Sequence, residues 1–270
     1  MRECFIPKNF HGSSLKVIEQ AIAIIDDYQS QGLTLTLRQL YYQFVSRDLI
    51  PNNVKQYDNL GALLSDARLA GLIDWSAIED RVRVPRNPTE FENLTALVNA
   101  ALYSYKLPRW DGQRAYCELW VEKDALSGVL QPLATQFHVT LMVNRGYSSQ
   151  TAMHEAGLRF KEQGEKDCYL FYLGDHDPSG EDMVRDVRDR LVMFGAELVV
   201  EKIALTMAQV NQYRPPPNPA KMTDSRANGY VQKFGGQSWE VDALPPQVLN
   251  QLIRDAFQDI IDTDVLKGVL

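Results

Sequence analysis

The spacing of apolar and polar positions divides this chain into two kinds of segment. In its first third, apolar residues recur every three or four positions, as on one face of a helix, over residues 13–30, 36–47 and 54–70. Further on, short apolar runs typical of buried strands fall at residues 115–121, 138–144 and 169–173. Helical patterns follow each of these runs. This order predicts an α/β chain, with a helical N-terminal part and then a parallel sheet joined by right-handed crossovers.

The N-terminal part predicts a winged helix-turn-helix. Thr36 is placed to cap the middle helix, whose apolar stripe consists of Leu37, Leu40, Tyr41, Phe44 and Val45. After the third helix, residues 73–84 predict a short turn and a hairpin strand. In such a unit the third helix lies in a DNA groove, where its candidate contacts are Lys55, Gln56, Asn59 and Arg68. Arg81, Arg83 and Arg86 would form a basic wing against phosphates, unless the unit is only a helical packing module with a solvated charged face.

Three acids follow strands of the predicted sheet. Asp175 and Asp177 come after the run 169–173 and lie on the same side, because strand side chains alternate. Glu122 follows another strand of the same sheet. The carboxyl ends of parallel strands share one edge, where ligands bind in open α/β sheets, and oxygen ligands suit Mg²⁺. The alternative for the two aspartates is the N-cap of a helix expected over 179–191.

Two adjacent tyrosines in the middle N-terminal helix are expected to face different ways. Tyr41 belongs to the apolar stripe, whereas Tyr42 lies about 100° further around the helix and shares a face with Arg38. A phenol has a pKa of about 10 and is a weak nucleophile at neutral pH, so an arginine that favours the phenolate would activate it. The same arginine could hold a phosphate. This pair predicts a transesterase, in which the tyrosine attacks phosphorus and a sugar hydroxyl leaves.

Four short sequence motifs of this chain are similar to motifs of one protein family. They are Arg38–Tyr42 (the pattern Arg-x-x-Tyr-Tyr), Val121–Ala125, Arg145–Tyr147 and Gly174–Gly180. They resemble the A subunit of topoisomerase VI and the meiotic double-strand-break protein, over about residues 30–205. The resemblance implies a winged-helix DNA-binding domain, which we place at 1–110. It also implies a Toprim domain with a Rossmann-like parallel sheet, which we place at 111–205.

The resemblance also implies the catalytic residues, the metal ligands, the substrate and the partners. Tyr42 would be the nucleophile with Arg38 as its helper, and the metal ligands for Mg²⁺, with Mn²⁺ as a substitute, would be Glu122, Asp175 and Asp177. The substrate would be double-stranded DNA, and in a homodimer the tyrosine of one protomer would act with the acids of the other. The topoisomerase form of the family needs a separate ATPase subunit. Because nothing in this sequence resembles an ATP site, such a subunit is a candidate partner.

Two other functions stay open. A Toprim nuclease would use the same acids with water in place of Tyr42. A DNA-binding module without enzymatic activity would act only with a partner. The net charge of −7, all of which arises after residue 110, argues against DNA binding, although bound Mg²⁺ would offset part of it.

Other residues narrow the class of protein. No apolar run approaches the roughly 20 residues of a membrane span, and no signal-peptide pattern is present, so we expect a cytoplasmic protein without membrane contact. Three cysteines, Cys4, Cys117 and Cys168, form neither a zinc pattern nor a disulfide framework. His176, between the two aspartates, either orients a phosphate or is only a polar residue at a strand end.

The remaining segment, residues 206–270, is expected to be an extension packed on the Toprim domain. Residues 214–219 are rich in proline and predict an extended stretch, whereas residues 247–261 predict an amphipathic helix. Glu240 and Asp242 lie between them and could add to an acidic site, but we do not include them among the predicted site residues.

Overall fold

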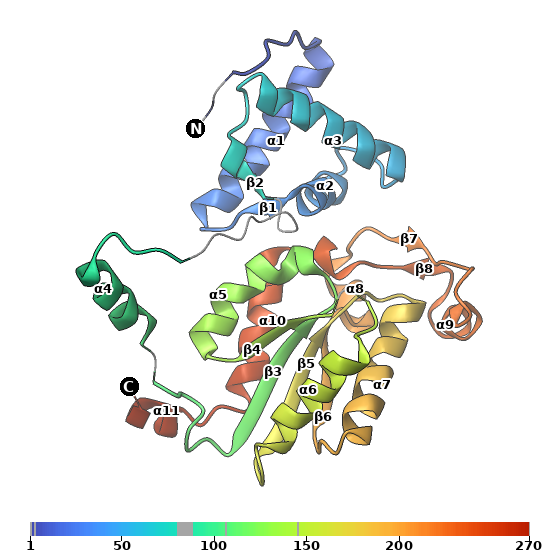
Figure 1. The fold of residues 1–270 in the computed structure, drawn as a ribbon. Coiled ribbons are helices and arrows are strands. Elements are labelled where there is room, and N and C mark those ends of the chain that lie inside the picture. The colour runs from blue at the N-terminus through green and yellow to red at the C-terminus, as the bar shows by residue number, and fades with distance from the viewer. Residues whose placement is uncertain (1, 3, 80–88, 106, 145, 270) are drawn as a thin grey trace.

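The computed structural model describes residues 2, 4–79, 89–105, 107–144 and 146–269. It confirms the α/β class: a largely helical unit lies beside a four-stranded parallel sheet whose two faces are covered by helices (Figure 1). Below, residues 4–79 are called the N-terminal unit and residues 107–269 the sheet domain.

Three helices build the N-terminal unit: α1 (Gly12–Ser30), α2 (Leu37–Ser46) and α3 (Val54–Leu69). Thr36 begins α2 as predicted, because its side chain accepts a hydrogen bond from the Gln39 backbone while the Gln39 side chain accepts one from the Thr36 backbone. The short 3-10 helix η1 (Trp75–Ala77) leads into β2 (Ile78–Glu79), which pairs in parallel with β1 (Leu35–Thr36). A parallel pair is not the predicted hairpin, and the rest of the predicted wing lies outside the described residues.

The predicted apolar stripe of α2 forms the centre of the N-terminal unit. Leu40 and Phe44 are fully buried, and they belong to one core with Ile24 of α1 and Leu64 of α3. Burial of each such side chain contributes about 1.5–3 kcal/mol before entropy is counted. This packing fixes α2 on one side and leaves its opposite face directed at the sheet domain.

The sheet consists of four parallel strands: β3 (Ala115–Val121), β4 (Thr140–Val143), β5 (Asp167–Leu173) and β6 (Val199–Ala204). Their order across the sheet is β4-β3-β5-β6. The sequence pattern predicts the first three strands and misses β6. In that edge strand, Glu201 and Lys202 interrupt the apolar run.

Helices cover both faces of the sheet. On one face lie α5 (Ser127–Phe137), which follows the 3-10 helix η2 (Asp124–Leu126), and α10 (Pro246–Gln258). On the other face lie α6 (Gln150–Lys161) and α7 (Pro178–Met193). Neighbouring strand residues alternate between the two cores, so Leu119 packs under α5 and α10 and Trp120 packs under α6 and α7.

The strand order contains a switch point between β3 and β5. The chain leaves β3 toward β4 on one side, and the next strand, β5, lies on the other side of β3. In open parallel sheets the crevice outside the carboxyl ends at such a point is the usual ligand site. Figure 1 shows the N-terminal unit above this edge of the sheet.

The segment after β6 contacts both parts of the molecule. It contains α8 (Met207–Tyr213), the antiparallel pair β7 (Asn218–Pro219) and β8 (Gln237–Ser238), α9 (Ala227–Phe234), the 3-10 helix η3 (Val241–Ala243), α10 and α11 (Thr263–Val269). Ala243 of η3 belongs to the core of the N-terminal unit, whereas Phe257 of α10 is fully buried under the sheet. These residues therefore join the two parts at the carboxyl-end edge.

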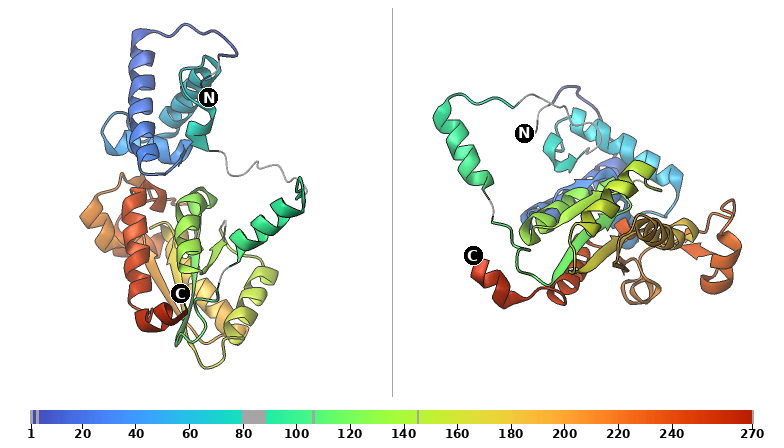
Figure 2. Two further views of the ribbon diagram at one scale, coloured as in Figure 1. Left: turned by 90° about the vertical axis from the view of Figure 1, so that its left-hand side faces the viewer. Right: turned by 60° about the horizontal axis from the view of Figure 1, so that its bottom comes forward.

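Helix α4 (Leu94–Ser104) stands apart from both parts (Figure 1, Figure 2). None of its residues is buried, although it is largely apolar and Leu94, Leu102 and Tyr103 are mostly exposed. Its first turn is closed by Asn93, whose side chain accepts a hydrogen bond from the Ala96 backbone. Within the part of the chain that the structure describes, no helix is long and apolar enough to cross a membrane.

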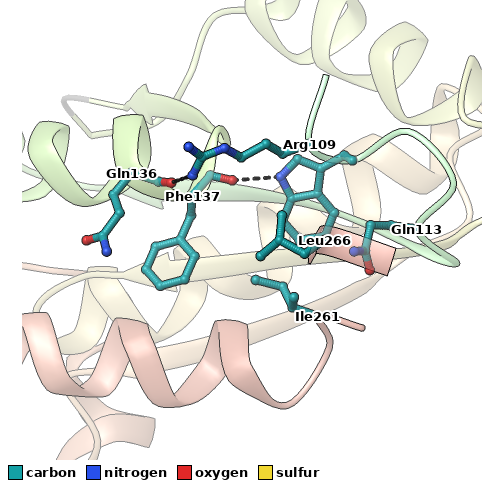
Figure 3. Close-up of a pocket in the computed structure, with 7 residues that line it drawn as sticks. Arg109, Gln113, Gln136, Phe137, Ile261 and Leu266 are labelled. Atoms are coloured by element: carbon teal, nitrogen blue, oxygen red, sulfur yellow. Dashed lines mark hydrogen bonds between the residues drawn. The ribbon is translucent and has the colours of Figure 1, made fainter. Parts of the chain in front are cut away.

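A small cavity of about 120 Å³ lies at the opposite, amino-end edge of the sheet (Figure 3). Trp110 donates a hydrogen bond of 2.8 Å from Nε1 to the Phe137 carbonyl, and Arg109 donates one of 2.8 Å to the Gln136 carbonyl. These bonds fix the chain before β3 against the end of α5. The cavity is thus a packing feature far from the switch point.

Candidate functional site

The carboxyl ends of β3 and β5 bring two acids together. The backbone nitrogen of Glu122 donates to the Leu173 carbonyl at 2.9 Å, which extends the ladder beyond the strands. The Glu122 carboxylate accepts, through Oε2, a hydrogen bond of 3.0 Å from the backbone nitrogen of Asp175. Glu122 and Asp175, 53 positions apart in the sequence, thus converge as the topology predicts.

Asp177 begins helix α7. Its Oδ1 accepts hydrogen bonds from the Gly180 backbone at 2.6 Å and from Ser179 Oγ at 3.0 Å. Asp177 is therefore the helix cap that the alternative interpretation predicts. Asp175 is not a cap, since its Oδ1 accepts a hydrogen bond of 2.9 Å from the backbone nitrogen of Val241. The turn between β5 and α7 is consequently held by α7 on one side and by η3 on the other.

Burial and mutual repulsion raise the pKa of the acids at the strand ends. Burial is the main cause for Asp175, whose pKa is raised to about 7 although Lys123 lowers it; the charges of Glu122 and Asp242 add to the rise. Burial also raises the pKa of Glu122, against the hydrogen bond from Asp175, and the negative charge of Asp177 raises it further. Negative charge at this edge is therefore held at an energetic cost that a cation would reduce.

The carboxylates at this edge suit Mg²⁺ in their chemistry. As the described residues are placed, no three His, Cys, Asp or Glu side chains are grouped to hold a metal ion. Asp175 is paired with Lys123, and Asp177 caps α7 through Oδ1. The other oxygens of Glu122 and Asp177 accept no hydrogen bond from any described residue. Mg²⁺ commonly uses one or two carboxylates, with water and a substrate phosphate completing its shell, so this donor set fits a metal that substrate helps to bind.

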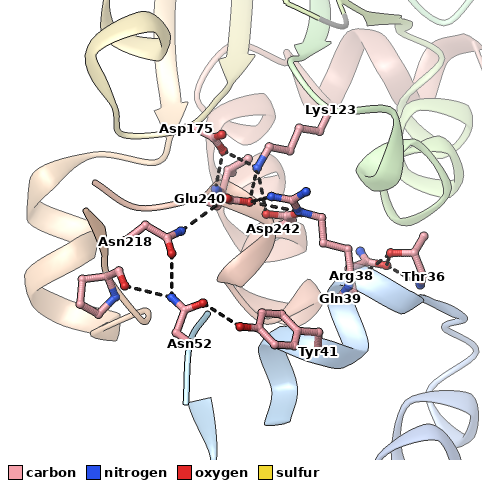
Figure 4. A network of polar contacts seen from close by, with 12 residues as sticks. Thr36, Arg38, Gln39, Tyr41, Asn52, Lys123, Asp175, Asn218, Glu240 and Asp242 are labelled. Carbon is pink, nitrogen blue, oxygen red and sulfur yellow. Dashed lines mark hydrogen bonds and ion pairs between the residues drawn. The ribbon is translucent and has the colours of Figure 1, made fainter. Parts of the chain in front are cut away.

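A chain of ion pairs links this edge to the N-terminal unit (Figure 4). Lys123 Nζ lies 2.9 Å from Asp175 Oδ1, 2.8 Å from Glu240 Oε2 and 3.1 Å from Asp242 Oδ1. Arg38 of α2 bonds to Glu240, and its Nε lies 3.3 Å from Asp242 Oδ2. Burial lowers the pKa of Lys123, but the three acids raise it by more, so the ammonium stays charged.

Tyr42 lies beside Arg38, as predicted, but it is not exposed. The guanidinium carbon is 6.0 Å from the centre of the Tyr42 ring. Only 3% of Tyr42 is exposed, because the segment after β6 covers this face of α2. Burial and then the charges of Glu240 and Asp242 raise the pKa of Tyr42, and outweigh the opposite effects of Arg38 and of a hydrogen bond with Asn218. Arg38 thus lowers the pKa of this phenol as expected, but burial and the two acids outweigh it, so Tyr42 is less acidic than a free phenol in the state seen here.

A cavity of about 360 Å³ opens beside Tyr42. It is formed by α2, the start of α3, β7 and the residue before η3, and its lining includes Arg38, Tyr41, Tyr57, Asn218 and Glu240. Tyr41 donates a hydrogen bond of 2.9 Å to Asn52 Oδ1, and Asn52 donates one of 2.8 Å to Asn218 Oδ1 (Figure 4). These bonds hold the polar wall of the cavity in place. Its size lies in the usual range for a ligand site.

The predicted DNA contacts of α3 do not share one environment. Solvent reaches three of them, Lys55, Gln56 and Asn59. Arg68 instead holds η1, because its guanidinium donates to the Trp75 carbonyl at 2.6 Å and lies 4.6 Å from the centre of the Trp75 ring. Arg81 and Arg83 lie outside the described residues. Among the predicted contacts that the structure describes, the ones that hold no other element in place are therefore in the first half of α3.

His176 has a structural environment. It is 2% exposed, and its Nδ1 lies 2.7 Å from the Tyr230 hydroxyl. The ring packs against Phe234 and Trp239, and burial lowers its pKa. The sequence predicts that His176 either orients a phosphate or is only a polar residue at a strand end. Its burial among aromatic side chains agrees with the second interpretation.

Sequence reasoning missed the residues at the centre of the network: Lys123, Asn218, Glu240 and Asp242. Asn218 lies in a proline-rich stretch that predicts only extended chain. Glu240 and Asp242 form an acid-x-acid pair like the one after β5, and that pair was the only available signal. Their charged partners, Arg38 and Lys123, come from segments more than 100 positions away, which no local pattern reveals.

Gly180 occupies a place where a larger residue would displace both aspartates. A Cβ there would lie 2.3 Å from the Asp175 carbonyl oxygen and 3.2 Å from Asp177 Oδ1. Backbone cannot yield as a flexible side chain can, so Gly180→Ala is expected to lower the free energy of unfolding by about 1–3 kcal/mol. Urea unfolding measures this loss. The control is Gly229→Ala in α9, where a Cβ meets open space and should be neutral or stabilising. Equal stability of the two variants would contradict the prediction.

This edge therefore brings together buried carboxylates, two cations that acids of the same chain pair, and a phenol on the wall of an open cavity. Such a combination is suited to phosphate chemistry. No model of a protein family matches the chain, and neither does any curated protein.

Proposed function

We propose that this chain cleaves double-stranded DNA by Mg²⁺-dependent tyrosine transesterification, in the manner of the topoisomerase VI A family. One observation carries the proposal: a continuous ion-pair network runs from Arg38, beside Tyr42, to Asp175 at the end of β5. It places the phenol and the acids at one interface between two parts of the chain. Three helices followed by a parallel sheet with acids at its switch point also support a winged helix followed by a Toprim domain.

In the proposed step, the oxygen of Tyr42 attacks a DNA phosphorus and the bond from phosphorus to one sugar oxygen breaks. The phenol gives up its proton to the surroundings, and the departing sugar oxygen takes one up, so atoms and charge balance. Arg38 stabilises the negative charge that develops on the phosphate oxygens. The resulting phosphotyrosine diester keeps the energy of the broken link, and the reverse attack reseals the strand without a cofactor.

The acids would hold the metal. Mg²⁺ at Glu122, Asp175 and Asp177, or Mn²⁺ in its place, would supply positive charge to the phosphate. The same charge would relieve the repulsion that raises the pKa of Glu122 and Asp175. The exposed start of α3, with Lys55 and Asn59, would contact the duplex. A second copy of the chain and a separate ATPase subunit are the partners that this function implies.

A second candidate, hydrolysis by water at the same acids, is favoured by one observation. Tyr42 is buried and its pKa is raised, which makes it a poor nucleophile until its surroundings change. A nuclease of this kind would not need the phenol, and its products would carry free ends.

The two functions are separated by one experiment. The protein is incubated with supercoiled plasmid and Mg²⁺ or Mn²⁺, denatured, and analysed on a gel with and without protease. Transesterification predicts DNA ends that enter the gel only after protease treatment, and no cleavage in EDTA. Ends that enter without protease would establish the hydrolytic nuclease instead. An uncut plasmid with both metals, in the presence of protein that binds DNA, would overturn both enzymatic functions for the isolated chain.

A further inference from the structure

Two cations from different parts of the chain meet on one carboxylate oxygen. Lys123 follows β3 in the sheet domain and donates a hydrogen bond of 2.8 Å to Glu240 Oε2. Arg38 belongs to α2 in the N-terminal unit and donates to the same oxygen, at 3.1 Å from Nε, with a second bond from its terminal nitrogen. A lysine and an arginine that converge on a single oxyanion are a common arrangement for binding phosphate.

Glu240 is the most exposed of the three acids in the network. The side chains of Asp175 and Asp242 are 10% and 0% exposed, and Asp175 is also bound by the Val241 backbone. The Glu240 side chain is 21% exposed, and apart from the two cations it receives only a long contact of 3.4 Å from Asn218 among the described residues. Burial would raise the pKa of Glu240, but Lys123 and Arg38 lower it to about 2, so it is an anion at neutral pH. The two cations therefore hold an anion that solvent reaches, whereas Asp242 is enclosed in the core.

The oxygen that Glu240 presents is next to the open cavity. Arg38, Tyr42 and Glu240 all line that cavity of about 360 Å³. An anion that entered it could meet the exposed part of Arg38, but it would contact Arg38 and Lys123 together only if the Glu240 carboxylate moved aside. With Glu240 in place, the cluster of Arg38 and Lys123 against three acids has no positive charge left for a second anion.

We infer that Arg38 and Lys123 together form a binding site for one phosphodiester group of DNA, and that the Glu240 carboxylate fills this site until DNA displaces it. The inference rests on the proposed function, because the bound phosphodiester would be the one that lies next to Tyr42. It adds a phosphate-binding role for Lys123 and a self-blocking role for Glu240. DNA and Glu240 then compete for the same two cations, which keeps the site closed in the absence of substrate.

The test is DNA binding by Glu240→Gln, measured in EDTA so that no cleavage contributes. The amide keeps the shape of the side chain and removes the charge that competes with phosphate. Fluorescence anisotropy with a short labelled duplex at constant salt should show binding at least about tenfold tighter than wild type, as expected for charged hydrogen bonds that become available. The control is Glu197→Gln, which makes the same change of charge at an exposed position at the amino-end edge and should alter binding by less than about twofold.

A second variant separates the phosphate site from general charge. The double variant Arg38→Gln, Glu240→Gln should lose the tighter DNA binding that Glu240→Gln shows. Arg38 is suitable for this test because its side chain is 46% exposed and is not part of a core. Inorganic phosphate is the competing source of the same anion. If Glu240→Gln binds inorganic phosphate more tightly than wild type but shows no gain for the duplex, the site takes free phosphate and the DNA part of the inference is wrong.

The outcomes for this site and for the proposed function are independent. Equal DNA binding by Glu240→Gln and Glu197→Gln, with both proteins folded by circular dichroism, would overturn the phosphate site whatever the plasmid assay shows. In that case Glu240 would be a structural bridge only, and its replacement would be seen as lower thermal stability. Tighter binding by Glu240→Gln together with an uncut plasmid would support the phosphate site and remove the cleavage function.

Discussion

A Tyr42→Phe variant is expected to bind DNA and to form no covalent adduct with it. The change removes one oxygen from a ring that is 3% exposed, so the packing of α2 against the segment after β6 is retained. Only the hydroxyl can form the bond to phosphorus, and therefore the expected effect on adduct formation is complete loss. The measurement is the fraction of labelled DNA that remains attached to protein after denaturation, with Mg²⁺ or Mn²⁺ present.

The neighbouring tyrosine supplies a matched control. Tyr41 donates to Asn52 at 2.9 Å and accepts from the Asn53 backbone at 2.8 Å, so Tyr41→Phe loses hydrogen bonds while the Tyr42 hydroxyl stays. It should be less stable by about 1 kcal/mol for a lost hydrogen bond and should still form adducts. Adducts that persist in Tyr42→Phe and disappear in Tyr41→Phe would show that the wrong tyrosine has been assigned. Adduct formation by both variants would remove tyrosine chemistry from this pair.

Replacing Glu118 with alanine is expected to destabilise the sheet domain by about 3–5 kcal/mol, the usual result of removing one partner of a buried ion pair. The Glu118 side chain is 0% exposed in the middle of β3. It accepts hydrogen bonds from Arg159 at 2.8 and 2.9 Å, from Tyr116 at 2.9 Å and from Trp120 at 2.8 Å. Its removal leaves an indole, a phenol and a guanidinium without their acceptor under α6. Urea unfolding, followed by tryptophan fluorescence, measures the loss.

Two further variants make this prediction specific. Glu155→Ala removes an exposed acid from the same helix that carries Arg159, and it should change stability by no more than about 0.5 kcal/mol. Glu118→Gln keeps an acceptor oxygen and should lie between the two. If Glu118→Ala were as stable as Glu155→Ala, the buried carboxylate would not be holding this face of the sheet.

The elements that sequence predicts best are those whose signals are local. The start of α2 is set by a reciprocal pair of hydrogen bonds between Thr36 and Gln39, and both residues are visible in the sequence three positions apart. The convergence of Glu122 and Asp175 follows from strand direction alone, because parallel strands end at one edge. Edge strand β6 was missed because only one side of it is buried by a neighbouring strand, which permits charges in its middle.

What sequence could not predict depends on contacts between distant segments. The helical period sets Tyr42 apart from the apolar stripe, but Tyr42 belongs to the same buried core as Tyr41. The period cannot show that residues about 200 positions later cover Tyr42. That cover reverses the expected direction of the Tyr42 pKa, since burial and two acids outweigh one arginine. In the same way, the capping role of Asp177 is local and could be foreseen, whereas the bond from Val241 to Asp175 could not.

Helix α4 bears on whether Tyr42 lies against the acids of its own chain or against those of a second copy. The chain passes from the N-terminal unit to the sheet domain through this helix, and none of its residues is buried against either part. Contacts of α4 therefore do not hold the N-terminal unit of one chain to the sheet domain of that same chain. Two copies that exchanged their N-terminal units would keep every bond of the network, with Arg38 of one chain on Glu240 of the other. Protein concentration, rather than any difference in sequence, would then set the balance between a self-contained monomer and a reciprocal pair.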